Sequence, residues 1–165
     1  MKKSQIWVLD VFFALLIFVS VLVLFFKSEL NLSNSDDLLF DDMTFESKLV
    51  SDSLLSKGFP AGWTAANVIE IGITDDYVIN ETKLSTLQSM DYTLSKSRLR
   101  TKYDYYLFFQ GVSGILNVGP NEGVGKPLVN STNILTREAP HNLVTVSRLV
   151  VFRSQPVKMV VYLWD

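Results

Sequence analysis

Residues 6–26 read IWVLDVFFALLIFVSVLVLFF, and this stretch decides how the chain is organised. Nineteen of its 21 residues are apolar, and the two exceptions are Asp10 and Ser20. As a helix it would be about 31 Å long, which matches the roughly 30 Å hydrocarbon core of a bilayer. The remainder has an ordinary globular composition, because about 43% of residues 29–165 are apolar. We therefore expect one membrane-spanning helix joined to one folded domain.

The charges on either side of this stretch predict its orientation. Lys2 and Lys3 precede it, whereas residues 27–46 contain one basic and six acidic side chains. Basic flanks stay on the cytoplasmic side of a membrane. The sequence therefore predicts a single-pass cell-membrane protein with a cytoplasmic N-terminus, residues 28–165 outside the cell, and membrane lipid as a partner.

Three interpretations of the N-terminal segment are open. A cleaved secretory signal peptide requires an apolar core of about 7–15 residues and a small-x-small cleavage site. The 21-residue core here ends in LFF and is followed by KSELNLS, and this stretch lacks such a site. A plain uncleaved anchor accounts for the length but leaves Asp10 unexplained. The third interpretation gives Asp10 a role, because an acid inside a membrane span is a functional hypothesis with a cation as its natural partner.

The third interpretation rests on a resemblance. The run Lys2-Lys3-Ser4-Gln5, followed by Ile6-Trp7-Val8-Leu9-Asp10 and a long apolar helix, resembles the start of an archaeal type IV pilin-like protein with a class III signal peptide. The resemblance implies that Lys2, Lys3 and Ser4 direct a leader peptidase to cut before Gln5. It also implies that Asp10 pairs with the freed amine of a neighbouring subunit.

The resemblance predicts a structural role. The partners would be the leader peptidase and other pilin-like subunits, in a homo- or hetero-oligomer, with the apolar helix serving for anchoring and filament assembly. The alternative is a plain single-span, membrane-anchored extracellular binding or interaction protein that does not polymerise. In both cases residues 1–4 are the basic leader or flank, and residues 5–27 are the transmembrane helix.

Residues 28–60 carry a second helical pattern. Leu39, Met43, Val50 and Leu54 are spaced by 4, 7 and 4, which keeps one side of a helix apolar. This amphipathic helix either continues the membrane span or is hinged to it at residues 28–35. Gly58 and Pro60 are typical of a helix end, so we expect the helix to reach residue 57.

Residues 61–165 predict an extracellular domain of short strands and helices. Asn80 and Asp91 are expected to cap short helices over 81–90 and 92–101. Strands are expected at 68–73, 78–79, 103–110, 115–118, 142–153 and 157–163, with a loop at 119–127 and a hairpin turn at 154–156. The fold class is α+β: a long N-terminal helix followed by a mostly antiparallel β domain with short helices, which is the pilin-like layout.

Catalytic and metal-binding signals are weak in this sequence. His141 is the only histidine, the chain has no Cys, and no GxSxG motif is present. The acidic pairs lack the spacing of a calcium loop, and the glycines of residues 119–126 lack the phosphate-loop spacing. We expect a protein that is not an enzyme, with no cofactor and no metal. The formal net charge of -2 argues against nucleic acid as a partner.

Two surface patterns remain. Asn31, Asn80 and Asn130 begin glycan acceptor sequons, which agrees with an exported domain, and Asn130 lies in loop-like sequence. Basic residues also alternate along residues 96–102, at Lys96, Arg98, Arg100 and Lys102. They either form a solvated helix end or bind an anionic surface or the acidic face of a partner.

Overall fold

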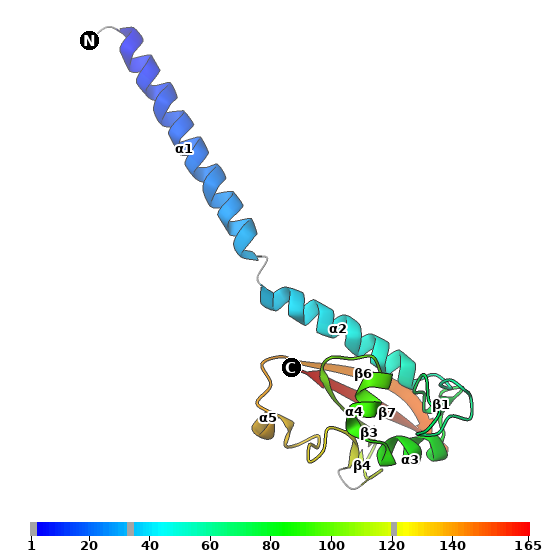
Figure 1. The fold of residues 1–165 in the computed structure, drawn as a ribbon. Helices are drawn as coiled ribbons and strands as arrows, with labels where there is room; N and C mark the ends of the chain where they lie inside the picture. Colours follow the sequence, from blue (N-terminus) through cyan, green and yellow to red (C-terminus); the bar gives the residue numbers. More distant parts are fainter. Residues whose placement is uncertain (1–2, 33–34, 120–121) are drawn as a thin grey trace. The chain divides into compact units, whose positions relative to one another are not determined.

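The computed structural model describes residues 3–32, 35–119 and 122–165, with side chains from 7–28, 39–119 and 122–165. The chain divides into two compact units, residues 1–39 and 40–165. Helix α1 (Lys3–Leu32) lies in the first unit, and α2 (Ser35–Leu54) runs from the first into the second (Figure 1). A long apolar helix followed by an α+β domain confirms the predicted fold class. The hinged and continuous alternatives differ at residues 33 and 34, which lie outside the described part of the chain.

Helix α2 packs through one side, as its periodicity predicts. Met43, Val50 and Leu54 are at most 1% exposed. Leu39, the first residue of the predicted apolar face, is 44% exposed. The helix ends at Leu54, three residues earlier than expected, because the chain turns before Gly58, which has φ +70°.

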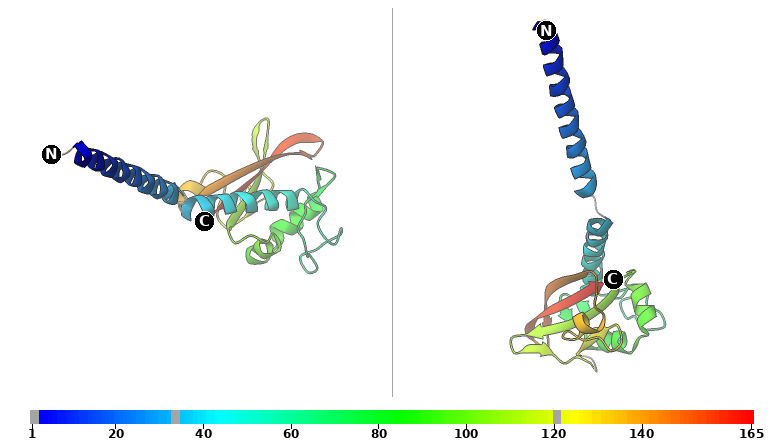
Figure 2. Two further views of the ribbon diagram at one scale, coloured as in Figure 1. Left: turned by 90° about the horizontal axis from the view of Figure 1, so that it is seen from above. Right: turned by 90° about the vertical axis from the view of Figure 1, so that its left-hand side faces the viewer.

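A mixed seven-stranded sheet forms the centre of the second unit. Its order is β1-β2-β6-β7-β3-β4, and β5 also pairs with β3. The strands are β1 (Thr74–Asp75), β2 (Val78–Ile79), β3 (Asp104–Gly111), β4 (Gly114–Leu116), β5 (Gly123–Gly125), β6 (Leu143–Phe152) and β7 (Gln155–Trp164). All pairs are antiparallel except β2 and β6, which meet in parallel at Val78 and Val151. Figure 2 shows β7 lying between β6 and β3.

The sheet is apolar on both faces. Tyr105, Leu107 and Phe109 of β3 belong to the larger core, which also contains the buried apolar residues of α2 and α3 (Glu81–Ser89). Tyr106 and Phe108 point to the other face, where they join a smaller cluster that includes Ile134 of α5 (Ile134–Arg137). This alternation follows from the two-residue period of a strand. The eight-residue run YDYYLFFQ therefore supplies side chains to two cores.

The helix caps and the terminal hairpin that the sequence predicts are present in the structure. Asn80 caps α3 by accepting hydrogen bonds from the amides of Thr82 and Lys83, and Asp91 caps α4 (Tyr92–Arg98). Helix α4 ends at Arg98, three residues before its expected end at residue 101. The terminal hairpin is confirmed by ten cross-strand pairs between β6 and β7. Its turn is Arg153-Ser154 instead of residues 154–156, because both residues have positive φ, as a two-residue type I′ turn requires.

The predicted strand at 68–73 is wrong. In this segment Glu70 forms only an isolated bridge with Phe59. The amide of Ile73 instead donates to the carbonyl of Leu54 at 2.9 Å, which satisfies an end group of α2. Trp63 donates to the carbonyl of Gly72 at 2.9 Å and holds the segment in place. Val68, Ile71 and Ile73 are buried and Ile69 is exposed, so the segment seals the C-terminal end of a helix through part of its apolar side chains.

The predicted loop at 119–127 is partly a strand. Gly123, Val124 and Gly125 pair with β3 as β5. A Cβ at Gly123 would lie 2.2 Å from the carbonyl oxygen of Leu107, and one at Gly125 would lie 2.3 Å from that of Tyr105. The glycines that indicated a loop are therefore needed for close approach of two backbones.

Candidate functional site

The apolar surface of α1 is the most distinctive functional feature of the first unit. Residues Trp7–Ser28 form a helix long and apolar enough to cross a membrane, and none of it is buried by the rest of the chain. The hydroxyl of Ser20 donates to the carbonyl of Leu16 at 2.8 Å, so this polar side chain is satisfied within the helix. Every described side chain of the span is thus available to lipid or to other helices.

Asp10 lies on this exposed surface, near the start of the span. Its carboxylate forms no hydrogen bond or ion pair with the described residues of the chain, and Ser20 is the other polar residue of 6–26. Four positions separate Asp10 from Ile6, or about 6 Å along the helix. Inserting an acid at this depth of a membrane costs less free energy than inserting it at the membrane centre, where the cost is roughly 2.5–3.5 kcal/mol. A partner for this carboxylate must come from outside the described side chains of the chain.

The predicted leader residues lie at the beginning of the same helix. Lys2 lies outside the described residues, and α1 begins at Lys3, so Ser4 and Gln5 have helical backbone. The predicted cut before Gln5 would leave a chain that is helical from its first described residue.

The three sequons occupy different settings. Asn31 belongs to α1, and its side chain lies outside the described part. The Nδ2 of Asn80 donates to Asp75 at 2.8 Å while its Oδ1 caps α3, so this amide serves the fold. Asn130 lies in a loop, where its Oδ1 accepts from the amides of Thr132 and Asn133. Of Asn80 and Asn130, Asn130 is therefore the one whose amide nitrogen could carry a glycan with less disturbance of the fold.

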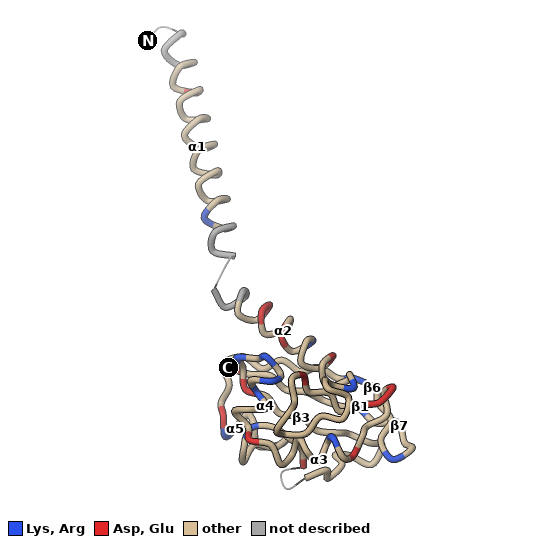
Figure 3. The backbone as a smooth tube through the Cα atoms, turned by 45° about the vertical axis from the view of Figure 1, so that its right-hand side comes forward, with Lys and Arg blue, Asp and Glu red and all other residues tan. Residues whose placement is uncertain are grey.

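Charged side chains of both signs are spread over the domain (Figure 3). Asp104 is the most connected of them: it accepts from Lys96 and Lys126 at 2.7 Å each and from the hydroxyl of Tyr92 at 2.8 Å. Burial raises the pKa of Asp104, but the hydrogen bonds from Lys126, Lys96 and Tyr92 outweigh it and hold that pKa below its usual range. Lys126 also pairs with Glu138, so the cluster joins α4, β3 and the segment after α5.

The basic residues of 96–102 do not form one surface. Lys96 pairs with Asp104, and Lys102 pairs with Asp42 of α2 at 2.5 Å. The side-chain hydrogen bonds from Lys102 and Tyr103 lower the pKa of Asp42. Arg98 and Arg100 line a cavity.

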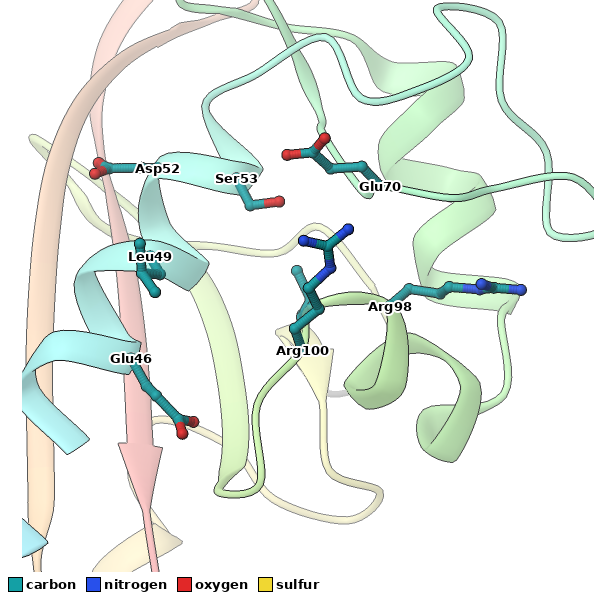
Figure 4. A pocket seen from close by; sticks show the side chains of 8 residues that line it. Glu46, Leu49, Asp52, Ser53, Glu70, Arg98 and Arg100 are labelled. Atoms are coloured by element: carbon teal, nitrogen blue, oxygen red, sulfur yellow. The ribbon is translucent and has the colours of Figure 1, made fainter. Parts of the chain in front are cut away.

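That cavity has a volume of about 330 Å³ and lies against α2 and the end of α4 (Figure 4). It is lined by Glu46, Leu49, Asp52, Ser53, Glu70, Arg98, Leu99 and Arg100. In Figure 4 the guanidinium of Arg100 points toward Glu70 and Ser53, whereas that of Arg98 points away. Neither arginine, nor Glu70, forms an ion pair with another described residue.

Arg100 is held in this place by an unusual backbone conformation. Its φ is +57°, and its amide donates to Ser97 while that of Thr101 donates to Lys96. This pattern is the Schellman motif that ends many helices, and its left-handed position is usually occupied by Gly. Arg100 belongs to the alternating basic residues of the sequence, but the cavity itself had no sequence signal because its walls are 17 to 54 residues apart.

The described residues of the cavity, the charge cluster and the sequons do not assemble a catalytic centre. His141 is exposed in the bend before β6. Among the described residues, no group of three or more His, Asp or Glu side chains is placed to hold a metal ion. The acids Asp42 and Asp75 instead pair with Lys102 and Lys83.

Comparisons with protein-family models, with curated proteins and with solved structures find no match to this chain. What defines the protein is therefore its architecture: one N-terminal helix long and apolar enough to span a membrane, followed by an α+β domain built on a mixed sheet.

Proposed function

We propose that this chain is a type IV pilin-like, single-pass membrane subunit whose N-terminal helix anchors it and packs with like helices. The observation that carries the proposal is Asp10, an acid that has no partner among the described residues and lies on a wholly exposed, almost entirely apolar helix surface. Neighbouring helices would replace lipid around α1, and a freed amine at Gln5 of another subunit would supply the cation for Asp10. A paired charge tolerates an apolar environment far better than an isolated one.

Two details of the N-terminus define what kind of subunit this would be. Ser4 would precede the cut, at a position where the family that the chain resembles most often has Gly. Asp10 would be the sixth residue after the cut, whereas the acid of that family is usually the fifth. One position rotates a side chain by about 100° around a helix. This offset favours a minor subunit, or one that anchors without forming long filaments, over a major subunit.

The first test is the N-terminus of the mature protein, read by mass spectrometry from membranes of a cell that makes the leader peptidase. The proposal expects Gln5 as the first residue. An intact Met1 or Lys2 would refute the leader and leave a plain anchor.

The second test is Asp10→Ala, with Ser20→Ala as its matched control. Ser20 is the other polar residue of the span and bonds within its own helix, so its loss should leave assembly unchanged. Removing one partner of a buried ion pair costs about 3 kcal/mol, which is more than a hundredfold in association. We expect Asp10→Ala to remove the assembled fraction in crosslinking and sedimentation while the chain stays in the membrane. Equal assembly of the two variants would exclude the pairing role.

A second candidate function, an anchored binding protein that does not polymerise, is favoured by the cavity beside Arg100. Keeping Arg at a position suited to Gly costs about 1–2 kcal/mol, and such strain is often kept for function. The guanidinium suits a ligand that carries a carboxylate. Citrate should then raise the melting temperature of the full chain, and Arg100→Gly should abolish that shift. No shift with citrate in the unmodified chain would argue against this candidate.

A further inference from the structure

We infer that strand β6 is a pairing edge through which two copies of this chain join their sheets. The open part of this edge is residues 143–149. On one side β6 pairs with β7 along its whole length, but on the other side β2 reaches it only at Val151. In the described structure seven residues of a ten-residue strand are therefore unpaired on that side.

The direction of the free backbone groups follows from one hydrogen bond. The amide of Val151 donates to the carbonyl of Tyr77 at 2.9 Å, away from β7. Since successive residues of a strand direct their backbone groups to opposite sides, the amides and carbonyls of 143, 145, 147 and 149 also point to the open edge. No described residue donates to those carbonyls or accepts from those amides.

The edge is also accessible and unguarded. Thr145, Ser147 and Leu149 are exposed, Leu149 by 71%. Natural proteins usually protect a long edge with a charge, a proline or a bulge. The pairing with β7 runs through ten consecutive positions without a bulge, and residues 143, 145, 147 and 149 carry neither charge nor proline. Arg148 points to the other face, where its guanidinium pairs with Asp52 of α2 at 2.7 Å.

A second copy of β6 fits this edge in antiparallel register. The register that uses the whole open stretch centres on Val146, so that Leu143 faces the second copy's Leu149 and Thr145 faces its Ser147. These are an apolar pair and a hydroxyl pair, both of which stabilise sheets when directly opposite. Each hydrogen-bonded pair exchanges two bonds, so the contact would contain about eight. A typical protein interface has about ten.

Membrane anchoring strengthens such a contact, because two chains held in one bilayer meet at a raised effective concentration. The pairing lies wholly in the second unit and does not depend on leader cleavage or on Asp10. The strand pairing and the proposed helix packing can therefore be tested independently, and the failure of one does not refute the other.

The test uses single cysteines, because the chain has none of its own. In the proposed register Val146 faces itself, in a non-hydrogen-bonded pair with about 4.5 Å between the two Cα atoms, a distance that a disulfide spans. We expect Val146→Cys to form a disulfide-linked dimer in membranes under mild oxidation. Ser113→Cys, in the exposed turn between β3 and β4, measures random collision, and we expect Val146→Cys to exceed it about tenfold. A yield no higher than that of Ser113→Cys would overturn the inference.

A blocking substitution completes the design. Ser147→Pro removes an amide that points to the open edge and takes no part in the ladder with β7, so the hairpin should survive. Combined with Val146→Cys, it should reduce the crosslink to the level of Ser113→Cys. If the proline variant loses its near-UV circular dichroism, Thr145→Lys replaces it, since it adds a charge to the edge while leaving the backbone intact. A folded blocking variant that still crosslinks fully would refute the pairing. Asp10→Ala should leave the Val146→Cys crosslink unchanged.

Discussion

Replacing Asp104 by Asn tests whether the charge cluster around β3 holds the domain together. Its carboxylate binds the ammonium groups of Lys96 and Lys126 at 2.7 Å each, and its side chain is 25% exposed. Fully exposed ion pairs contribute 0.2–1 kcal/mol, whereas hydrogen bonds to buried charges contribute about 1.5–3 kcal/mol. Each pair here lies between these limits, at about 1 kcal/mol. Asn keeps the shape and the bond from Tyr92. We expect Asp104→Asn to lower the free energy of unfolding by about 2 kcal/mol at pH 7.

The pH dependence has a definite sign. The pKa of Asp104 is lower in the folded chain than in the unfolded chain, so its contribution is complete above the unfolded value of about 3.9. It is lost as the pH falls through the folded value. The difference in free energy of unfolding between the unmodified chain and Asp104→Asn should therefore shrink as the pH falls from 5 to 3.

Urea unfolding of the detergent-solubilised full chain, followed by near-UV circular dichroism, measures both effects. Asp76→Asn is the matched control, because its side chain is 89% exposed and lies 3.4 Å from Lys57. We expect a loss of less than about 0.5 kcal/mol for the control. The reasoning would be refuted if Asp104→Asn lost no more than Asp76→Asn, or if its loss were the same at pH 7 and pH 3.

Three further substitutions test local features, each by urea unfolding. Gly72→Ala should lower the free energy of unfolding by at least about 3 kcal/mol, because its Cβ would lie 2.3 Å from the backbone of Ser56 and of Gly58. Its control is Gly62→Ala, which has open space around it and should lower the free energy of unfolding by less than about 1 kcal/mol. Asn80→Ala should cost about 1–2 kcal/mol through loss of the α3 cap, and an unchanged midpoint would show that the cap is dispensable. Arg100→Gly should stabilise the domain by up to about 1 kcal/mol, whereas a lower midpoint would mean that the guanidinium contributes to folding.

Features set by near neighbours in the chain could be predicted from sequence. The 21-residue apolar run, the caps Asn80 and Asp91 and the terminal hairpin depend on residues a few positions apart, and all of them are present in the structure. The boundaries were less accurate, because a helix end is decided by what satisfies its carbonyls. Here Ile73 does so for Leu54, from 19 positions away.

Features that depend on which segments become neighbours could not be predicted. An apolar segment such as 68–73 has the composition of a strand whether it joins a sheet or closes the end of a helix. Gly123 and Gly125 indicate a loop by composition, but also allow two backbones to approach. The cavity at Arg100 and the open edge of β6 both arise from strand order and helix packing, which are non-local. Asp10 needed no structure, because its significance lies in the residues directly around it.

The two proposed contacts between copies differ in symmetry, and this difference limits what they can build. Antiparallel pairing of β6 with itself is isologous: it uses the same edge on both chains and is complete with two. Pairing of Asp10 with the amine of a neighbour is heterologous, since the acid of one chain meets the N-terminus of the next, and it can continue without limit. A chain that uses both would assemble from dimers, and one that uses only β6 would stop at two. The size of the assembly that carries the Val146→Cys crosslink separates these cases. A chain that uses both contacts should fall from larger assemblies to crosslinked dimers when Asp10→Ala is added, whereas one that uses only β6 should be a dimer with or without the acid.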